Sequence, residues 1–213
     1  VIGVSVIGVS VIVVEDTDGR AGLRRYARTI EDAPRILVLC TANQCRSPMA
    51  AVLLARRLDE ASVPALVRSA GLLPGGRPAW PEAEAVMAEW GLDLSTHESC
   101  QMLGLHVSGA DLVLGMTREH VREAVALDPV AYDRSFTIKE LARRGGVEPR
   151  GRRSLDAWLA ALTANREVEE LLGADPADDV EDPIGGPIAA FRDTADELEA
   201  LVARIVRAGW GVG

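Results

Sequence analysis

Short runs of apolar residues alternate along this chain with longer segments in which apolar residues recur every three or four positions. The first pattern predicts buried strands and the second predicts helices with one apolar face. Strands are predicted at residues 36–39, 63–69, 111–116 and 134–137, and helices at 48–58, 81–90, 117–127, 138–146, 154–172 and 187–208.

The order of these elements predicts an α/β fold. Strands that alternate with helices form a parallel sheet covered by helices on both faces. Right-handed crossovers then place the loop after the first strand at the carboxyl edge of the sheet, where such folds bind ligands. The helix at 81–90 should end at Gly91, and the helix at 138–146 should be closed by its two glycines.

The N-terminal stretch stands apart from this pattern. "VIGVSVIGVSVIVV" repeats a pentapeptide and runs into the acidic "EDTDG". It lacks the basic start of a signal peptide, and it is shorter than the roughly 20 residues that a membrane span needs. Its alternation favours a strand, either added to a sheet edge or paired with another copy of the chain. Residues 19–34 are charged and predict a linker or short helix. We therefore divide the chain into an N-terminal extension of no assigned role at 1–33 and one domain at 34–213.

Composition narrows the function classes. The 213 residues are 48% hydrophobic, which suits one enzyme-sized domain with a full core. A net charge of −9 argues against nucleic acid as a partner, and no segment predicts a membrane anchor. Three cysteines without finger spacing predict neither a disulfide framework nor a metal site, so we expect a reducing cytoplasm and no metal.

The candidate chemistry lies in "RILVLCTANQCRSPMA", where the first strand enters a loop and Pro48 opens a helix. The free N–H groups and the dipole at a helix start hold anions, and Arg46 adds a fork of donors that matches two phosphate oxygens. Cys40 sits at the floor of the loop, where the same field favours the nucleophilic thiolate. Taken singly, Cys40 and Cys45 would be small buried apolar residues, but the combination predicts attack on phosphorus.

Such an attack needs an acid to protonate the leaving oxygen. Asp182 in "DDVEDPIGG" is the best candidate, since Pro183 restricts its backbone. Repulsion from Asp178, Asp179 and Glu181 should favour its protonated form. Read alone, this stretch would be a solvated acidic turn.

At this point the chain resembles the low-molecular-weight protein tyrosine phosphatase family. The resemblance covers about 34–208 and rests on "VLCTANQCRSPMA", on "SAG" at 69–71, "DLSTH" at 93–97, "DLVLGM" at 111–116 and "DPIGG" at 182–186. It implies a four-stranded parallel sheet flanked by helices in a Rossmann-like three-layer arrangement. It also implies hydrolysis in two steps through a phosphocysteine, without a cofactor, acting on phosphotyrosine proteins or small aryl phosphates and releasing inorganic phosphate.

The resemblance assigns the catalytic roles position by position. Cys40 is the nucleophile, Arg46 clamps the phosphate, Ser47 donates to the Cys40 sulfur, and Asp182 acts as general acid and then as base. The phosphate-binding loop comprises Thr41, Ala42, Asn43, Gln44 and Cys45.

Two further features follow from the resemblance. Asn43 takes a left-handed backbone conformation, supported by Ser47, Ser69 and His97. Cys45 forms a reversible disulfide with Cys40 that protects the nucleophile from over-oxidation.

The chain also departs from the family pattern. Ala42 replaces a usual glycine, Cys100 stands near a usual arginine, and Ile184 and Gly185 stand where two tyrosines often follow Asp-Pro. Trp80 is displaced from its usual place. These changes leave the choice of substrate more open than the phosphatase chemistry itself.

One segment and two alternatives complete the sequence picture. Residues 132–174 are longer than the usual connection, and the helix around Trp158 is predicted to cap the site or to form an interface. The alternatives are an arsenate reductase of the same fold that uses a small thiol, although Met116 and Thr117 stand where relay cysteines would be expected, and a phosphate-binding module without turnover.

Overall fold

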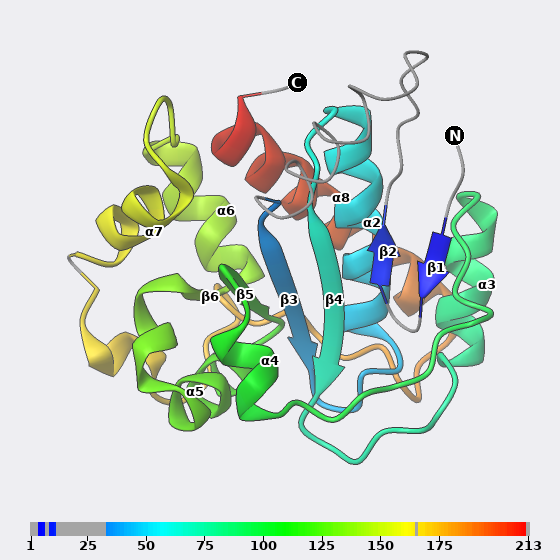
Figure 1. The fold of residues 1–213 in the computed structure, drawn as a ribbon. Coiled ribbons are helices and arrows are strands. Elements are labelled where there is room, and N and C mark those ends of the chain that lie inside the picture. The colour runs from blue at the N-terminus through cyan, green and yellow to red at the C-terminus, as the bar shows by residue number, and fades with distance from the viewer. Residues whose placement is uncertain (1–3, 7–8, 12–32, 165, 212–213) are drawn as a thin grey trace.

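A six-stranded sheet forms the centre of the molecule in a computed structural model that describes residues 4–6, 9–11, 33–164 and 166–211 (Figure 1). Four of its strands are β3 (Arg35–Cys40), β4 (Leu66–Gly71), β5 (Leu112–Gly115) and β6 (Ser135–Thr137). They pair in parallel in the order β4-β3-β5-β6. The predicted α/β class and the four-stranded parallel sheet are confirmed.

Strand β3 lies between its two parallel neighbours. The chain passes from β3 to β4 on one side and then reaches β5 on the other. The loop after β3 therefore lies at the point where the strand order reverses, which is where open parallel sheets bind ligands.

The N-terminal stretch contributes a short hairpin. Strands β1 (Val4–Val6) and β2 (Val9–Val11) pair antiparallel, and Ser10 pairs with Val67 on the edge strand β4. The structure thus has two short strands at the sheet edge, as one of the two sequence alternatives predicts. The linker or helix predicted within 19–34 falls almost wholly outside the described residues.

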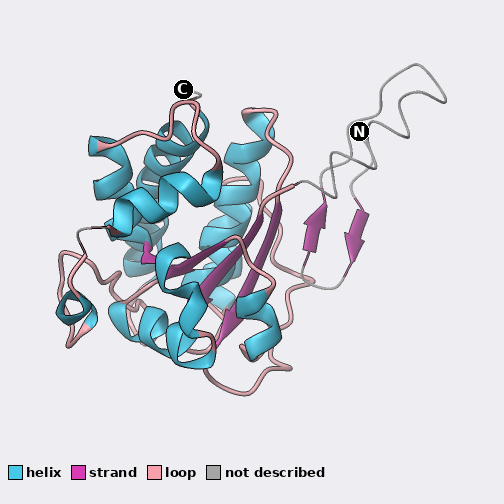
Figure 2. Ribbon diagram, turned by 60° about the vertical axis from the view of Figure 1, so that its left-hand side comes forward, coloured by secondary structure: helices cyan, strands magenta, loops and turns pink. Residues whose placement is uncertain are grey.

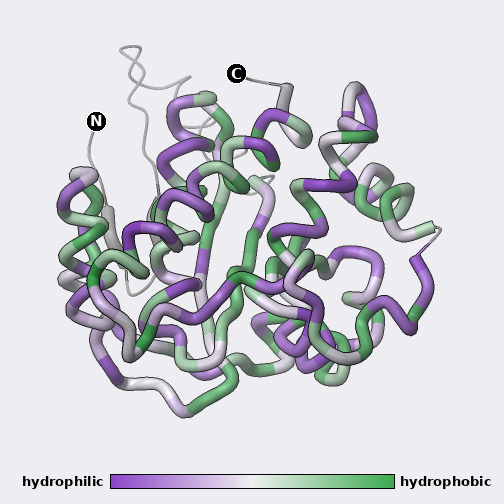
Figure 3. The backbone as a smooth tube through the Cα atoms, turned by 180° about the vertical axis from the view of Figure 1, so that it is seen from behind, coloured by the Kyte–Doolittle hydropathy of each residue, from purple (hydrophilic) through white to green (hydrophobic). Residues whose placement is uncertain are grey.

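Helices cover both faces of the sheet (Figures 1 and 2). The larger core holds helices α2 (Arg46–Glu60), α3 (Pro81–Glu89), α6 (Ile138–Val147), α7 (Leu155–Thr163) and α8 (Ile188–Trp210). The smaller core holds α4 (Gly104–Ser108), α5 (Arg118–Leu127) and a 3₁₀ helix, Pro129–Arg134. Side chains alternate along β3, so Ile36 and Val38 enter the larger core while Leu37 and Leu39 enter the smaller one. Hydrophobic and hydrophilic positions accordingly alternate along the helices in Figure 3.

The single helix predicted at 154–172 is wrong. The structure has α7 over Leu155–Thr163 and then a separate 3₁₀ helix, Val168–Leu171. The Arg166 side chain is buried between them, where its Nη2 donates to Glu140 at 2.7 Å and its Nη1 donates to the Ser135 carbonyl at 2.9 Å. A buried charge needs such partners, so the chain leaves the helical path here and places the Arg166 side chain against them.

The predicted closure of the helix at 138–146 by glycines is also wrong, because α6 continues through both glycines to Val147. A Cβ at Gly145 would lie 3.0 Å from the ring of Trp158, so this glycine makes room for an aromatic side chain. Trp158 is fully buried, and its indole N–H donates to the Glu148 carbonyl at 2.7 Å.

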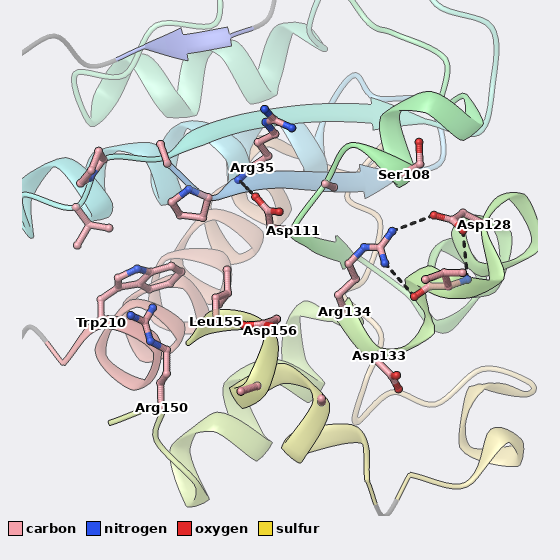
Figure 4. A pocket seen from close by; sticks show the side chains of 18 residues that line it. Arg35, Ser108, Asp111, Asp128, Asp133, Arg134, Arg150, Leu155, Asp156 and Trp210 are labelled. Carbon is pink, nitrogen blue, oxygen red and sulfur yellow. Dashed lines mark hydrogen bonds and ion pairs between the residues drawn. The ribbon is translucent and has the colours of Figure 1, made fainter. Parts of the chain in front are cut away.

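Helix α7 lies at the amino ends of the parallel strands, away from the carboxyl end of β3 (Figure 1). The prediction that it caps the site is therefore wrong. Beside it, an open cleft of about 1280 Å³ is lined by α7 residues such as Leu155 and by Arg35 at the start of β3 (Figure 4). Arg134 and Asp128 are paired at 2.9 Å in this cleft, and Asp111 accepts the Arg35 backbone N–H at 2.7 Å.

Candidate active site

The loop between β3 and α2 lies in close contact with the end of the neighbouring strand β4. Asn43 has a left-handed backbone with φ of +53°, a conformation that Asn tolerates better than most residues. A Cβ at Gly71, the last residue of β4, would lie 2.8 Å from the Asn43 backbone nitrogen. Only glycine lets the loop curl this closely against the neighbouring strand.

Cys40 lies at the base of the loop, and the structure brings Ser47 to its sulfur. The Ser47 hydroxyl, in the first turn of α2, donates to Cys40 Sγ at 3.0 Å. Cys40 and Ser47 are both buried. A hydroxyl donor at this distance stabilises a thiolate.

Asn43 is the centre of a polar network that holds the loop. Its Nδ2 donates to Ser47 Oγ at 2.9 Å and to Ser69 Oγ at 2.8 Å. Its Oδ1 accepts the backbone N–H of Cys100 at 2.8 Å, and its carbonyl lies 2.6 Å from His97 Nε2. The predicted supporting residues are therefore brought together, whereas the role of Cys100 was missed because it is a backbone contact that no side-chain pattern reports.

His97 holds this position as a donor. A backbone carbonyl only accepts, so Nε2 of His97 carries the proton. Burial lowers the pKa of His97 below its ordinary value, even though the bond to the Asn43 carbonyl opposes this shift.

Arg46 spans the loop and the acidic segment late in the chain. Its Nη1 donates to the Val180 carbonyl at 3.1 Å, and its Nη2 lies 2.5 Å from Asp182 Oδ2 and 3.4 Å from Thr41 Oγ1. The Arg46 side chain is 6% exposed, and its buried Nε has no partner among the residues that the structure describes. Two segments of the chain, the loop with Cys40 and Arg46 and the acidic segment with Asp182, are thus brought into contact.

Ion pairs of the buried Asp178 carboxylate hold the acidic segment in place. Asp178 is bonded to Arg118 at 2.7 Å and to Arg143 at 2.7 Å, on α5 and α6. Burial alone would raise the pKa of Asp178, but these arginines hold it below its ordinary value. Asp179 accepts the backbone N–H of Arg118 at 2.8 Å. Two of the three carboxylates expected to repel Asp182, those of Asp178 and Asp179, are thus engaged by arginine and by a backbone N–H.

A backbone contact completes this attachment. Val180 N–H donates to the Met116 carbonyl, at the end of β5, at 2.7 Å. Asp182 follows two residues later, and its side chain is 42% exposed, so it faces the open side of the loop.

Two other loop residues have structural partners. Gln44 Nε2 donates to the Pro78 carbonyl at 3.1 Å, and the Gln44 carbonyl accepts the Trp80 N–H at 2.7 Å. Trp80 is therefore attached to the loop through its backbone, and its partly buried side chain packs against the larger core. Burial, followed by the nearby Cys40, raises the pKa of Cys45 far above its ordinary value, so Cys45 is a neutral thiol.

Sequence reasoning also missed His120. Its Nε2 lies 3.1 Å from Thr41 Oγ1, and its Nδ1 accepts the Thr117 backbone N–H at 3.0 Å. The position of His120 just after β5, which neighbours β3, is the signal that would have indicated it.

A parallel sheet whose central strand ends in a cysteine and arginine loop, facing a carboxylate from another segment, defines a cysteine-based phosphatase. The chain belongs to the low molecular weight phosphotyrosine protein phosphatase family, whose model matches residues 35–148.

Relatives and solved structures agree with this assignment. A protein-arginine-phosphatase of Geobacillus stearothermophilus is 34% identical over 173 residues, which cover 80% of this chain and 93% of that protein. A probable low molecular weight protein-tyrosine-phosphatase, EpsP, of Ralstonia nicotianae is 39% identical over 60% of this chain and 85% of its own length. The crystal structure of a low molecular weight protein tyrosine phosphatase from T. tengcongensis matches with a TM-score of 0.63 and 32% identity, covering 82% of this chain and 99% of that one.

Family membership implies phosphorylated proteins as substrates and phosphate as product. Within the described residues, no helix has the length and apolar character to cross a bilayer.

Proposed function

We propose that this protein hydrolyses phosphorylated protein side chains, first of all phosphotyrosine, through a phosphocysteine. The observation that carries the proposal is the contact of Asp182 with Arg46, which belongs to the same loop as Cys40. Cys40 attacks phosphorus, the new P–S bond forms as the bond to the leaving oxygen breaks, and Asp182 donates its proton to that oxygen. Water then attacks phosphorus with Asp182 as base, and the Cys40 thiolate leaves with help from the Ser47 hydroxyl.

The phosphoryl group replaces Asp182 as the partner of Arg46. Cys45 provides no side-chain cap for α2, and no acidic residue lies in its first turn, so the first N–H groups are available to an anion. Arg46 adds its unpartnered Nε and the Nη2 that now holds Asp182. Once the dianion takes Arg46, the Asp182 carboxyl is released from this contact.

A second substrate class, phosphoarginine, is favoured by a specific observation. Ile184 and Gly185 follow Asp182–Pro183, so these two positions supply no aromatic wall for a tyrosine ring. Two relatives that match 80% and 81% of this chain are named protein-arginine-phosphatases. Here Asp182 would deliver its proton to a guanidine nitrogen as the P–N bond breaks.

Two assays test these proposals. The first compares hydrolysis of para-nitrophenyl phosphate, with EDTA present, by the intact chain and by Cys40→Ser. Activity only in the intact chain is expected, whereas equal activity, or none in folded and reduced protein, would contradict the mechanism and return attention to arsenate reduction or to binding without turnover. The second compares kcat/KM on phosphotyrosine and phosphoarginine peptides of the same sequence, and the larger value assigns the substrate class.

We also propose that the protein works in a reducing compartment such as the cytoplasm. Cys40, Cys45 and Cys100 are free thiols, and the reaction requires Cys40 to be reduced.

A further inference from the structure

Thr41, directly after the nucleophile, is held between a histidine and an arginine. Thr41 Oγ1 lies 3.1 Å from His120 Nε2 and 3.4 Å from Arg46 Nη2. His120 is 1% exposed, whereas Thr41 is half-buried. The histidine therefore reaches the open loop only through the threonine.

The partners of His120 fix its tautomer. The Thr117 backbone N–H can only donate, so the Nδ1 that it bonds at 3.0 Å carries no proton and also accepts the Thr117 hydroxyl, whose oxygen lies 2.7 Å away. The ring proton of the neutral imidazole is then on Nε2, which donates to Thr41. Burial, with repulsion from Arg46 and Arg122, lowers the pKa of His120 to about 3, which keeps the ring neutral.

This arrangement directs the Thr41 hydroxyl proton. A hydroxyl group accepts through two lone pairs and donates one proton. His120 Nε2–H and Arg46 Nη2–H both donate to Thr41 Oγ1, so its own proton points away from both. Among the described residues, no other acceptor is bonded to this hydroxyl.

The free proton faces the place where an anion would bind. Arg46 Nη2 contacts both Thr41 Oγ1 and Asp182 Oδ2. An oxygen that displaces Asp182 from this nitrogen arrives beside the Thr41 hydroxyl. We propose that His120 is a positioning residue that presents the Thr41 hydroxyl as a donor to the phosphoryl group on Arg46, an inference that rests on the proposed function of the loop.

The threonine is tested first. Thr41→Val keeps the shape but removes the hydroxyl, and Thr41→Ser keeps the hydroxyl. Loss of one hydrogen bond to a charged group predicts that Thr41→Val weakens orthophosphate binding by roughly tenfold or more, with Thr41→Ser within about threefold of the protein with Thr41. Equal dissociation constants with Thr41 and with Thr41→Val would overturn the proposal.

Two replacements of His120 separate positioning from simple packing. The His120→Gln side chain reaches as far as Nε2 and retains a donor to Thr41, whereas the His120→Asn side chain reaches only as far as Nδ1 and retains an acceptor for Thr117. The proposal predicts that His120→Asn binds orthophosphate as weakly as Thr41→Val does and that His120→Gln stays close to wild type. If His120 only fixes the start of α5, the order reverses. A reversed order, or equal losses in both variants, would overturn the proposal.

Coupling provides the final readout. In the Thr41→Val background, His120→Asn should weaken orthophosphate binding no further, and an additional loss as large as in wild type would contradict the mechanism. Binding is measured by calorimetry with Cys40→Ser as the common background. This separates the two proposals, because an inactive wild-type enzyme would refute the phosphatase mechanism while the ranking of phosphate affinities would still test Thr41 and His120. Thermal unfolding confirms that each variant is folded, and the Thr41 pair decides the outcome if a His120 variant is not.

Discussion

Asp182 Oδ2 lies 2.5 Å from Arg46 Nη2, although the two residues are 136 positions apart in the chain. The general acid of the proposed mechanism is therefore held by the group that binds the substrate. In the proposed mechanism an arriving phosphoryl group would separate this pair, so that substrate binding and release of the acid would be one event.

The first prediction concerns this pair. Asp182→Asn should lower kcat on phenyl phosphate by about 10²-fold or more but lower kcat on an activated aryl phosphate far less, because only the poor leaving group needs a proton. Orthophosphate should bind at least as tightly, since Asn competes less for Arg46. Steady-state kinetics on both substrates measure this, and equal losses would remove Asp182 from the acid role.

A second prediction concerns the attachment of the acidic segment. Asp178→Asn weakens bonds to Arg118 and Arg143, so we expect a loss of about 2 kcal/mol in the free energy of unfolding. Turnover of poor leaving groups should fall, because the segment also carries Asp182, while orthophosphate affinity is kept. Arg192→Met, which breaks an exposed pair with Glu89, is the matched control and should leave urea unfolding almost unchanged. Identical behaviour of the two variants would contradict the structural role of Asp178.

The buried histidine makes stability depend on pH. The pKa of His120 is about 3 in the folded protein and near 6.5 when unfolded, so the unfolded chain binds more protons between these values. The contribution of His120 to the free energy of unfolding is fully present above about pH 6.5 and is lost as the pH falls toward 3. Between pH 7 and pH 5 this loss is about 2 kcal/mol. Urea unfolding at both pH values should show a smaller change for His120→Gln. An unchanged difference would mean that other groups carry the effect.

Two adjacent glycines in α6 should respond in opposite directions. Gly145→Ala places a Cβ 3.0 Å from the Trp158 ring and 3.2 Å from the Ala208 Cβ, and the overpacking should cost about 1–3 kcal/mol. Gly146→Ala meets only the end of Arg204 at 3.7 Å and should stabilise the helix by about 0.5–1 kcal/mol. Thermal unfolding of the two variants measures these changes in stability. A stabilised Gly145→Ala variant would show that the space beside the Trp158 ring accommodates a methyl group.

Oxidation provides a further prediction. Peroxide converts the Cys40 thiolate to a sulfenic acid, which the Cys45 thiolate attacks to form a disulfide and release water. Because the pKa of Cys45 is raised by burial, disulfide formation should accelerate with rising pH. Mass spectrometry should detect the Cys40–Cys45 disulfide and recovery by dithiothreitol. Sulfinic acid at Cys40 without that disulfide would contradict the role of Cys45.

The loop could be predicted because its determinants are local. A short apolar run that is β-branched in part, a cysteine, an asparagine suited to positive φ and a proline in the first helical turn all lie within 36–48. The alternation of strands and helices was readable for the same reason, since each period is set by neighbouring residues.

The errors arose where distant contacts decide the local structure. Arg166 interrupts the helix predicted at 154–172 because Glu140 and Ser135 are its partners, and Gly145 stays inside α6 because Trp158 packs on it. Asp178 looked like a neighbour that repels Asp182, but Arg118 and Arg143 come from helices far along the chain. Helix α4, Gly104–Ser108, was missed because so short a segment has no periodicity to detect.

The position of β3 between two other strands also determines how the loop with Cys40 unfolds. Its amides are bonded to β4 and β5 on either side, so they should exchange with solvent deuterium only when the whole domain opens. Residues 171–173 are instead held to α5 through Arg122, which bonds the carbonyls of Leu171 and Gly173. We expect residues 171–173 to open while the sheet stays folded, whereas the loop that holds Cys40 should lose its structure only when the whole domain unfolds.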